Sequence, residues 1–274
     1  TGAHREHDPR DGREEGRVTR PVALITGSSS GIGRDMACAF ADAGYDVAVV
    51  AETPLEHQQE VVDGLPRGDG ARHAAYRTDV SSATAVQALA DAVHRDLGTV
   101  DVLINNAAIW TTTEPGVTPL AEFDRLVDVN LRGPYYVAHH FLPSMLARGR
   151  GNLIFVASVS GIAGDPHSAA YSATKAGVAM LTRTFAATLG PKGIRVNAIA
   201  PGAVATPMTA MLRTPEGEAV IQSMMKSHPS PTRRFFMEPS EISRLALFLA
   251  SDASSALHGA VLVADQGLSA TLPA

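Results

Sequence analysis

A short apolar run, Val22–Ile25, leads directly into the glycine-rich stretch Thr26–Gly33 (TGSSSGIG), and a helical pattern follows over 34–43. A strand, a glycine-rich turn and a helix in this order aim backbone N–H groups and a helix N-terminus at one place. That arrangement is typical of a site for the pyrophosphate of a dinucleotide. A flexible serine–glycine loop is the alternative interpretation, which the position between a strand and a helix disfavours.

Each glycine of this turn has an expected task. Gly27 permits the sharp turn, Gly31 lets a phosphate approach the backbone, and Gly33 lets helix and strand pack closely. The predicted cofactor-binding residues of the turn are Gly27, Ser29, Ser30, Gly31, Ile32 and Gly33.

Apolar strands and helical segments alternate along the rest of the chain, which is typical of a parallel sheet with right-handed crossovers. We predict an α/β fold, a single-domain Rossmann fold with a doubly wound parallel sheet of about seven strands and helices on both faces. The expected strands are 22–25, 46–51, 74–80, 100–104, 152–157, 193–200 and 260–264. The expected helices are 34–43, 57–65, 81–97, 122–147 with an interruption near Gly133-Pro134, 172–189 and 242–250.

The two ends of the predicted domain differ in character. Residues 1–20 hold five Arg and five Asp/Glu but almost nothing apolar. Such a segment cannot bury enough surface to offset the entropy of ordering, so we expect a disordered tail, and it lacks the apolar core of a secretory signal. Residues 21–274 are expected to form one domain, in which the polar, Pro- and Met-rich stretch 207–236 forms an irregular flap over the site.

Composition excludes several classes of function. The net charge of −5 gives no reason to expect a nucleic-acid partner. The single cysteine, Cys38, excludes an internal disulfide framework and a cysteine zinc cluster, and we predict no metal. No apolar run reaches the roughly 18 residues that span a bilayer, so no membrane partner is expected.

Glu52 directly follows the second expected strand. A carboxylate at this point accepts hydrogen bonds from the adenosine ribose diol and repels a 2′-phosphate. No Arg or Lys lies in the glycine turn, and none follows the strand before Arg67. The pattern therefore favours NAD over NADP, with a solvated loop charge as the alternative interpretation of Glu52.

Tyr171 and Lys175 lie four residues apart, which places them on one face of a helix. A cation beside a phenol stabilises phenolate, so we expect the pKa of Tyr171 to fall towards neutral pH. Such a tyrosine can exchange a proton with an alcohol or carbonyl oxygen. Taken alone, the pair is equally an ordinary Tyr/Lys pair on a solvated helix face.

Seven short motifs occur in one order along Val22–Leu268: TGSSSGIG (26–33), DV (79–80), NNAA (105–108), Asn130, Ser158, YSATK (171–175) and PGAVAT (201–206). In this set the chain resembles the short-chain dehydrogenase/reductases of the common type of about 250 residues. Similar members include 3-oxoacyl-acyl-carrier-protein reductases and sugar dehydrogenases.

The resemblance implies a role for each matching residue. It implies that Tyr171 is the catalytic acid/base, that Lys175 lowers its pKa and binds the nicotinamide ribose, and that Ser158 polarises the substrate oxygen. It implies that the backbone carbonyl of Asn130 holds a water in the proton relay to Lys175. The cofactor contacts that it implies are Asp79, Val80, Asn106, Ala107, Tyr171, Lys175, Pro201, Gly202, Val204 and Thr206, in addition to the glycine turn and Glu52.

Three positions depart from the family pattern. Ala108 stands where the usual NNAG has glycine. Ala51 takes the usual place of the acidic residue, and Glu52 comes one position later. Gln266 replaces the first glycine of a C-terminal Asp-Gly-Gly, where we expect altered packing or an altered subunit contact.

The function expected from these residues is NAD(P)(H)-dependent interconversion of a secondary alcohol and a ketone. A 3-oxoacyl-thioester reductase, a sugar or polyol dehydrogenase and a non-catalytic dinucleotide-binding protein remain open. Trp110 is a pocket wall or a core residue, and His167 is a pocket group or a solvated one. The methionines and phenylalanines of the flap favour an apolar or bulky substrate. The resemblance also implies a cytoplasmic homotetramer, or a homodimer, built from 122–147, 171–189 and the C-terminal region.

Overall fold

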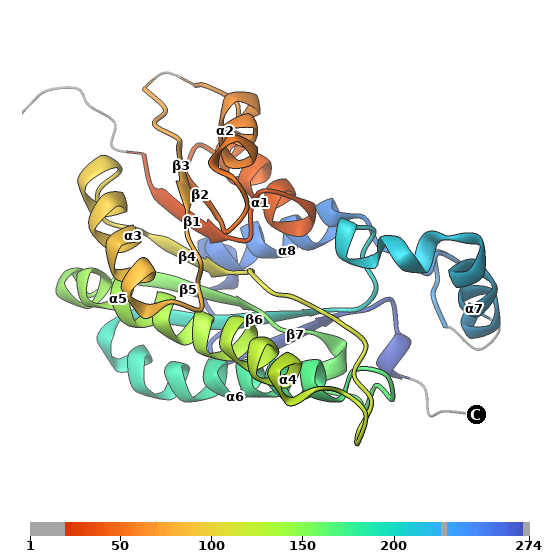
Figure 1. Ribbon diagram of the computed structural model, residues 1–274. Helices are drawn as coiled ribbons and strands as arrows, with labels where there is room; N and C mark the ends of the chain where they lie inside the picture. Colours follow the sequence, from red (N-terminus) through yellow and green to blue (C-terminus); the bar gives the residue numbers. More distant parts are fainter. Residues whose placement is uncertain (1–19, 69, 226–228, 271–274) are drawn as a thin grey trace, which may run out of the picture.

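The computed structural model describes residues 20–68, 70–225 and 229–270 (Figure 1). The expected N-terminal tail lies outside these residues, apart from Arg20. The Arg20 guanidinium lies 3.2 Å from a carboxylate oxygen of the buried Asp46 and donates to the Tyr45 carbonyl at 3.3 Å. Arg20 thus belongs to the folded domain, one residue ahead of the predicted boundary.

The centre of the fold is one sheet of seven parallel strands in the order β3-β2-β1-β4-β5-β6-β7. This confirms the predicted doubly wound sheet. The chain runs outwards from β1 to β3 and then returns to β4 beside β1, so the order reverses between β1 and β4. Such a reversal opens a crevice at the carboxyl ends of the strands. The strands are β1 (Val22–Thr26), β2 (Asp46–Ala51), β3 (Ala74–Arg77), β4 (Val102–Asn105), β5 (Gly151–Val156), β6 (Ile194–Pro201) and β7 (Val261–Ala264).

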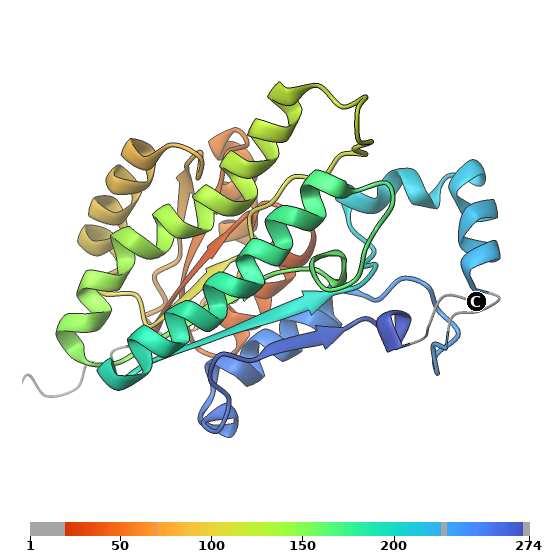
Figure 2. The same cartoon turned by 90° about the horizontal axis from the view of Figure 1, so that it is seen from below.

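Helices cover both faces of the sheet (Figures 1 and 2). Helices α1, α2 and α8 pack on one face, and α3, α5 and α6 pack on the other. The α-helices are α1 (Gly31–Asp42), α2 (Leu55–Gly64), α3 (Ala83–Asp96), α4 (Leu120–Val127), α5 (Gly133–Arg148), α6 (Ala169–Leu189), α7 (Pro215–Met225) and α8 (Pro239–Ala250). Short helical turns are η1 (Asp128–Arg132), η2 (Val159–Gly161), η3 (Gly190–Lys192), η4 (Pro207–Arg213), η5 (Asp252–Ser254) and η6 (Leu268–Ala270). No helix in the described part combines the length and apolarity needed to cross a bilayer.

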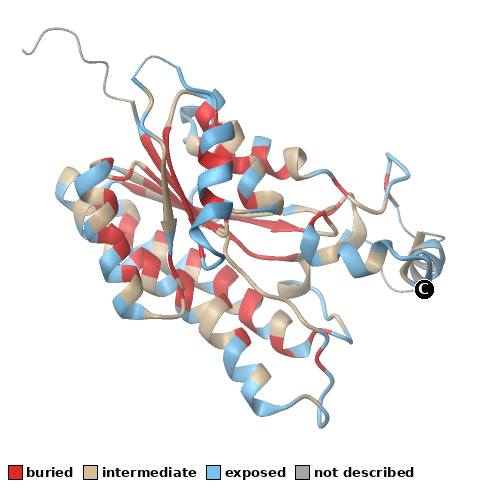
Figure 3. Cartoon of the chain, turned by 45° about the horizontal axis from the view of Figure 1, so that its top comes forward, coloured by how far each residue is buried: buried red, intermediate tan, exposed pale blue. Residues whose placement is uncertain are grey.

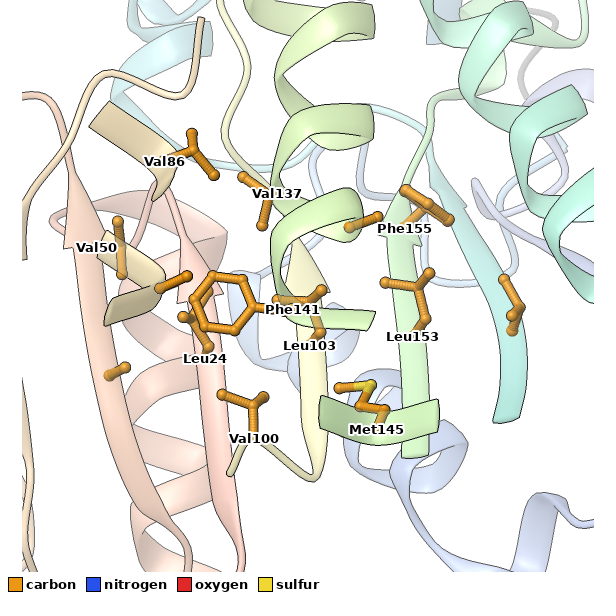
Figure 4. Packing of buried hydrophobic residues seen from close by; sticks show 14 of the residues in the cluster. Leu24, Val50, Val86, Val100, Leu103, Val137, Phe141, Met145, Leu153 and Phe155 are labelled. Carbon is orange, nitrogen blue, oxygen red and sulfur yellow. The ribbon is translucent and has the colours of Figure 1, made fainter. Parts of the chain in front are cut away.

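Alternate residues of each central strand enter the two cores, as the pleat requires. In β1, Leu24 joins the core under α3, α5 and α6, whereas Ala23 and Ile25 join the core under α1 and α8. Figure 4 shows Phe141 of α5 lying over Leu24 and Leu103 in the first of these cores. Both faces of the strands are therefore buried (Figure 3), which explains why they are continuous apolar runs in the sequence.

The long helix expected over 122–147 is interrupted near Gly133-Pro134, as predicted, by a π-helical turn, η1, that ends at Arg132. Asn130 lies at the centre of this turn. Pro134 lies in the first turn of α5, directly after the π turn, and the residues before it are also helical. Its missing N–H therefore falls at the junction of η1 and α5, where the hydrogen-bond pattern of the helix changes.

The flap 207–236 is not irregular throughout, because Pro207–Arg213 and Pro215–Met225 are helical. Helix α7 begins with Pro215, and Glu216 and Glu218 lie in its first turn. A proline at the first helical position and acids near the N-terminus both stabilise a helix start. The Thr214 hydroxyl also accepts from the Gly217 N–H at 3.3 Å.

We predict that Phe141→Ala lowers the free energy of unfolding by about 3–5 kcal/mol, because a fully buried aromatic ring leaves a cavity. Urea unfolding followed by circular dichroism measures the loss. Phe123→Ala is the matched control. Because Phe123 is 43% exposed, this substitution should lower the free energy of unfolding by less than about 1 kcal/mol. Equal losses for the two variants would contradict the packing described here.

Candidate active site

A cleft of about 690 Å³ opens at the carboxyl ends of the strands, across the reversal between β1 and β4. It collects residues from segments far apart in the chain. The predicted site residues that line it are Gly27, Ser29, Ser30, Gly31, Ile32, Gly33, Glu52, Asp79, Val80, Asn106, Ala107, Ser158, Tyr171, Lys175, Pro201, Gly202, Val204 and Thr206. Asn130 lies behind the wall of the cleft, fully buried.

The glycine turn has the conformation that its sequence predicts. Gly27 has a φ of +66°, and a Cβ there would come within 2.8 Å of the Ala107 backbone. A Cβ on Gly33 would come within 2.3 Å of the Gly27 carbonyl oxygen. Both positions therefore require glycine, the first for its backbone angle and the second for close packing of α1 against the turn.

The N-terminus of α1 is open towards the cleft. Its N-cap residue, Ser30, makes no side-chain capping hydrogen bond, and no acidic residue lies in the first turn. The unpaired N–H groups and the positive end of the helix dipole are thus left for an anion. This arrangement fits a pyrophosphate group.

Thr26 and Asn106 join the ends of β1 and β4. The Thr26 hydroxyl accepts from the backbone N–H groups of Asn106 and Ala107, each at 3.0 Å. The Asn106 amide donates to the carbonyls of Thr26 at 2.9 Å and Gly27 at 3.2 Å. Asn106 therefore holds the glycine turn in place, a positioning task that differs from the cofactor contact that the resemblance implies.

Acidic groups lie at the adenosine end of the cleft. The exposed Glu52 follows β2, and Asp79 follows β3 with its carboxylate fixed by the Ser81 N–H at 2.9 Å and hydroxyl at 2.6 Å. One cation nearby was absent from the sequence-based prediction. Arg77 donates to the Glu52 carbonyl at 3.1 Å from the neighbouring strand, a proximity that only strand pairing produces.

Ser158, Tyr171 and Lys175 come together where β5 ends and α6 begins. The Lys175 ammonium is buried, donates to the Val156 carbonyl at 2.8 Å and lies 5.6 Å from the centre of the Tyr171 ring. Ser158 is the N-cap of η2, and its hydroxyl accepts from the Ser160 N–H at 3.1 Å. Two hydroxyl groups and an ammonium thus border the same part of the cleft.

The pKa of Tyr171 moves opposite to the expected direction. Burial raises the pKa of Tyr171 to about 12, hydrogen bonding with Ser158 lowers it, and the charge of Asp165 raises it further. Burial also lowers the pKa of Lys175 to about 8. Desolvation outweighs the attraction between the two groups, because the ammonium is directed to the Val156 carbonyl. Tyr171 is therefore a phenol, a proton donor, at neutral pH.

Asn130 acts through its side chain in this structure. Its amide oxygen accepts from the Ile109 N–H, its amide nitrogen donates to the Ile109 carbonyl, each at 2.8 Å, and the same nitrogen lies 3.4 Å from the Thr174 hydroxyl. The side chain therefore ties η1 to the segment after β4 and to α6. The relay role of its backbone carbonyl remains a prediction.

At the substrate end of the cleft, the structure agrees with the second of the two alternatives for His167, a solvated side chain. The His167 side chain is exposed and is not among the lining residues, whereas Trp110 lines the cleft and donates from its indole N–H to Ser168 at 2.9 Å. Asp165 and Leu268 also line the cleft, and neither residue was named as a candidate from the sequence. The flap residues in the lining are Pro207, Met208, Thr209, Leu212 and Phe235.

The departures from the family pattern have visible consequences. Ala108 lies in the wall of the cleft. Gln266 has a φ of +53°, a conformation natural to glycine, and its amide oxygen accepts from the hydroxyls of Ser230 and Thr232. Gln266 thus ties the end of the flap to the C-terminal region.

A family model described as enoyl-(acyl carrier protein) reductase, adh_short_C2, matches residues 27–269. The chain is 39% identical to a cis-4-hydroxycyclohexanecarboxylate dehydrogenase of Sinomonas cyclohexanicum, covering 91% of this chain and 96% of the relative. It is 35% identical to the 3-oxoacyl-[acyl-carrier-protein] reductase of Thermotoga maritima, covering 92% and 99%.

A solved structure described as an NAD(P)-dependent gluconate 5-dehydrogenase of Beutenbergia cavernae, with NADP bound at low occupancy, superposes with a TM-score of 0.82. It is 33% identical over 93% of this chain and 98% of that one. The fold and cleft define a nicotinamide-dinucleotide-dependent oxidoreductase of the Rossmann type. The chain belongs to the short-chain dehydrogenase/reductase family, and the activity supported by these relatives is NAD(P)-dependent interconversion of alcohols and ketones.

We predict that burial of the Lys175 ammonium makes stability depend on pH. Its pKa is lower in the folded state than in the unfolded state, so the unfolded chain binds more protons between pH 8 and 10.5 and stability rises with pH there. Between pH 7.5 and 9.5, the free energy of unfolding of the wild type should rise by about 2 kcal/mol relative to that of Lys175→Met.

Urea unfolding at both pH values measures this difference. Lys192→Met, which removes an exposed ammonium, is the control and should show no pH-dependent difference from the wild type. A Lys175→Met difference that is the same at both pH values would contradict a lowered pKa of Lys175.

Proposed function

We propose that the protein interconverts a secondary alcohol and a ketone with Tyr171 as the acid/base. The supporting observation is that Tyr171, Ser158 and Lys175 border one cleft with the open N-terminus of α1. Tyr171 can supply a proton, and the N-terminus of α1 suits a pyrophosphate. A single cleft therefore serves both the cofactor and the reacting oxygen.

When bound, the nicotinamide ring supplies or takes the hydride. In reduction, Tyr171 donates its phenol proton to the carbonyl oxygen, and its raised pKa keeps that proton in place at neutral pH. The Ser158 hydroxyl donates a hydrogen bond to the same oxygen as negative charge develops on it. In oxidation, the phenolate of Tyr171 takes the hydroxyl proton.

Lys175 supports proton transfer in both reduction and oxidation. Its ammonium lies beside the Tyr171 ring, and a pKa of about 8 keeps most of it charged at pH 7. A cation there favours the phenolate whenever the proton leaves Tyr171. The Thr174 hydroxyl bonded to the Tyr171 carbonyl, together with the Asn130 amide near Thr174, holds this turn of α6 in register.

We propose NAD as the preferred cofactor. Glu52 and Asp79 line the adenosine end, and a shallow hollow of about 350 Å³ beside them adds Asp124 and Asp128, with Arg125 as its basic residue. A 2′-phosphate there would meet mostly negative charge. Arg77 opposes this effect but is bonded to the Glu52 carbonyl.

Within the enzyme class, a 3-oxoacyl-thioester reductase and a sugar or polyol dehydrogenase both remain alternatives, and each has a counterpart among the similar proteins. A non-catalytic dinucleotide-binding protein is the alternative outside that class. It has less support, because such a protein has no need of the proton-transferring groups that border this cleft.

We further propose a homotetramer, or a homodimer, in the cytoplasm. Large apolar side chains are exposed on α4, α5 and α6, namely Leu120, Tyr135 and Met180, and others on α8 and β7, namely Phe248 and Val263. Such exposed groups favour subunit contacts. The free thiol of Cys38 is compatible with a reducing compartment.

Replacing Tyr171 by Phe should lower kcat by about 10²–10⁴-fold, because the proton donor is lost. The dissociation constant for NADH, measured by fluorescence, should change less than about threefold, since the ring remains. Tyr135→Phe, which removes an exposed hydroxyl, should leave both values unchanged. A Tyr171→Phe variant with near-wild-type kcat would refute the mechanism.

Cofactor preference provides a separate test. The wild type should have a higher kcat/KM with NAD than with NADP, and Glu52→Gln should raise the NADP-to-NAD ratio by about tenfold by removing repulsion. Glu56→Gln, a nearby exposed change of the same charge, should leave the ratio unchanged. The proposal fails if the wild type prefers NADP or if Glu52→Gln has no effect.

A further inference from the structure

Asp165 places a carboxylate at the substrate end of the cleft. It lines the cleft together with Ser158, Ser160 and Tyr171, on the segment between η2 and α6. Its charge acts on the Tyr171 phenol, so the two groups are close enough to interact electrostatically. The carboxylate is half-buried, which limits screening by water.

The Asp165 carboxylate has hydrogen-bonding capacity to spare. One oxygen accepts from the His167 N–H at 3.2 Å, and the other lies 3.4 Å from the Ser160 hydroxyl. A carboxylate accepts about four hydrogen bonds. These two contacts leave part of the capacity unused, and because Asp165 lines the cleft, a donor on the substrate can use it.

Within the described residues, Asp165 forms no ion pair. The charged residues among those that line the cleft are Glu52, Asp79, Asp165 and Lys175. Lys175 is directed to the Val156 carbonyl. Arg213, on the flap, donates to the Thr206 carbonyl at 2.8 Å and lies over the Phe236 ring. The negative charge at the substrate end is therefore not neutralised by either group.

The rest of the lining at the substrate end is largely apolar. It is formed by Trp110, Met208, Leu212, Phe235 and Leu268. Trp110 is fixed by its hydrogen bond to Ser168, so the indole presents a rigid surface. An apolar body of the substrate would pack here, leaving Asp165 to meet a polar substituent.

We infer that Asp165 selects substrates by charge. It favours a ketone or secondary alcohol whose apolar body carries a hydroxyl or a protonated amino group away from the reacting carbon. It disfavours substrates with a carboxylate or phosphate at that position. This inference rests on the proposed function, because it needs the reacting oxygen to lie at Ser158 and Tyr171.

The substrates expected for this chain differ in charge from those named for two of the similar proteins. Their names specify hydroxycyclohexanecarboxylate and gluconate, both of which are carboxylates. A substrate carboxylate placed beside Asp165 would add like-charge repulsion in a partly dry cleft. The expected substrates here are neutral or cationic relatives of such molecules.

A matched series of ring compounds tests the inference. The substrates are cyclohexanol and its trans-4 derivatives carrying hydroxymethyl, protonated amino or carboxylate groups, assayed with NAD at pH 7.5. The wild type should have a kcat/KM for the carboxylate at least about tenfold below that for the hydroxymethyl compound. In Asp165→Asn, that ratio should fall to about threefold or less.

Two variants control for effects other than charge at this position. Asp165→Glu keeps the charge and should keep the wild-type order. Asp91→Asn removes one negative charge from the exposed face of α3 and should also keep it. A second readout is the pH profile of alcohol oxidation, whose acid limb should move to lower pH in Asp165→Asn, because phenolate forms more easily without the neighbouring charge.

Binding separates this inference from the proposed function. The ligands are cyclohexylmethanol, cyclohexylammonium and cyclohexanecarboxylate, titrated into the protein–NADH complex by fluorescence. If the ligands bind in the predicted order but no substrate is turned over, the proposed function is refuted and the inference about Asp165 stands. Equal binding of the carboxylate and the alcohol, no binding of any ring ligand, or an order unchanged in Asp165→Asn would overturn the inference.

Discussion

The hydrogen bonds between the ends of β1 and β4 are the constraint on which the cleft depends. Thr26 and Asn106 exchange side-chain and backbone hydrogen bonds across the reversal of the sheet, and the close packing of Gly33 sets α1 against the same turn. These contacts aim the uncapped N-terminus of α1 into the cleft. The proposed reacting groups at the end of β5 and on α6 border the same cleft, because the strand order places β5 beside β4.

Local patterns were sufficient to predict the parallel sheet and most of the cleft lining. The central strands are buried on both faces, so they appear as apolar runs, and ligand-facing residues follow them directly. The start of α7 was missed, although Thr214-Pro215-Glu216 is an ordinary helix start. The polar composition of the surrounding segment favoured an irregular flap instead. The π turn around Asn130 was not readable, because it depends on hydrogen bonds to Ile109, a residue that comes twenty-one positions earlier.

Electrostatics could not be predicted from sequence spacing. The four-residue separation of Tyr171 and Lys175 correctly placed the two on one helix face, yet it gave no measure of desolvation. Burial dominates both groups, and the ammonium is held by a carbonyl of β5. Asp165 acts on the same phenol, and its place in the cleft follows from how the segment between η2 and α6 folds back. Tyr171 is therefore a phenol at neutral pH, and in the proposed function it donates its proton during reduction.

The proposed function requires that hydride passes in this cleft between a secondary alcohol and a nicotinamide. A secondary alcohol that the protein accepts, deuterated at its carbinol carbon, can be oxidised with NAD while the label is followed by mass spectrometry. Each NADH formed should carry one deuterium, and the rate should be slower than with the unlabelled alcohol. Release of the deuterium to water, or ketone formation without labelled NADH, would contradict it.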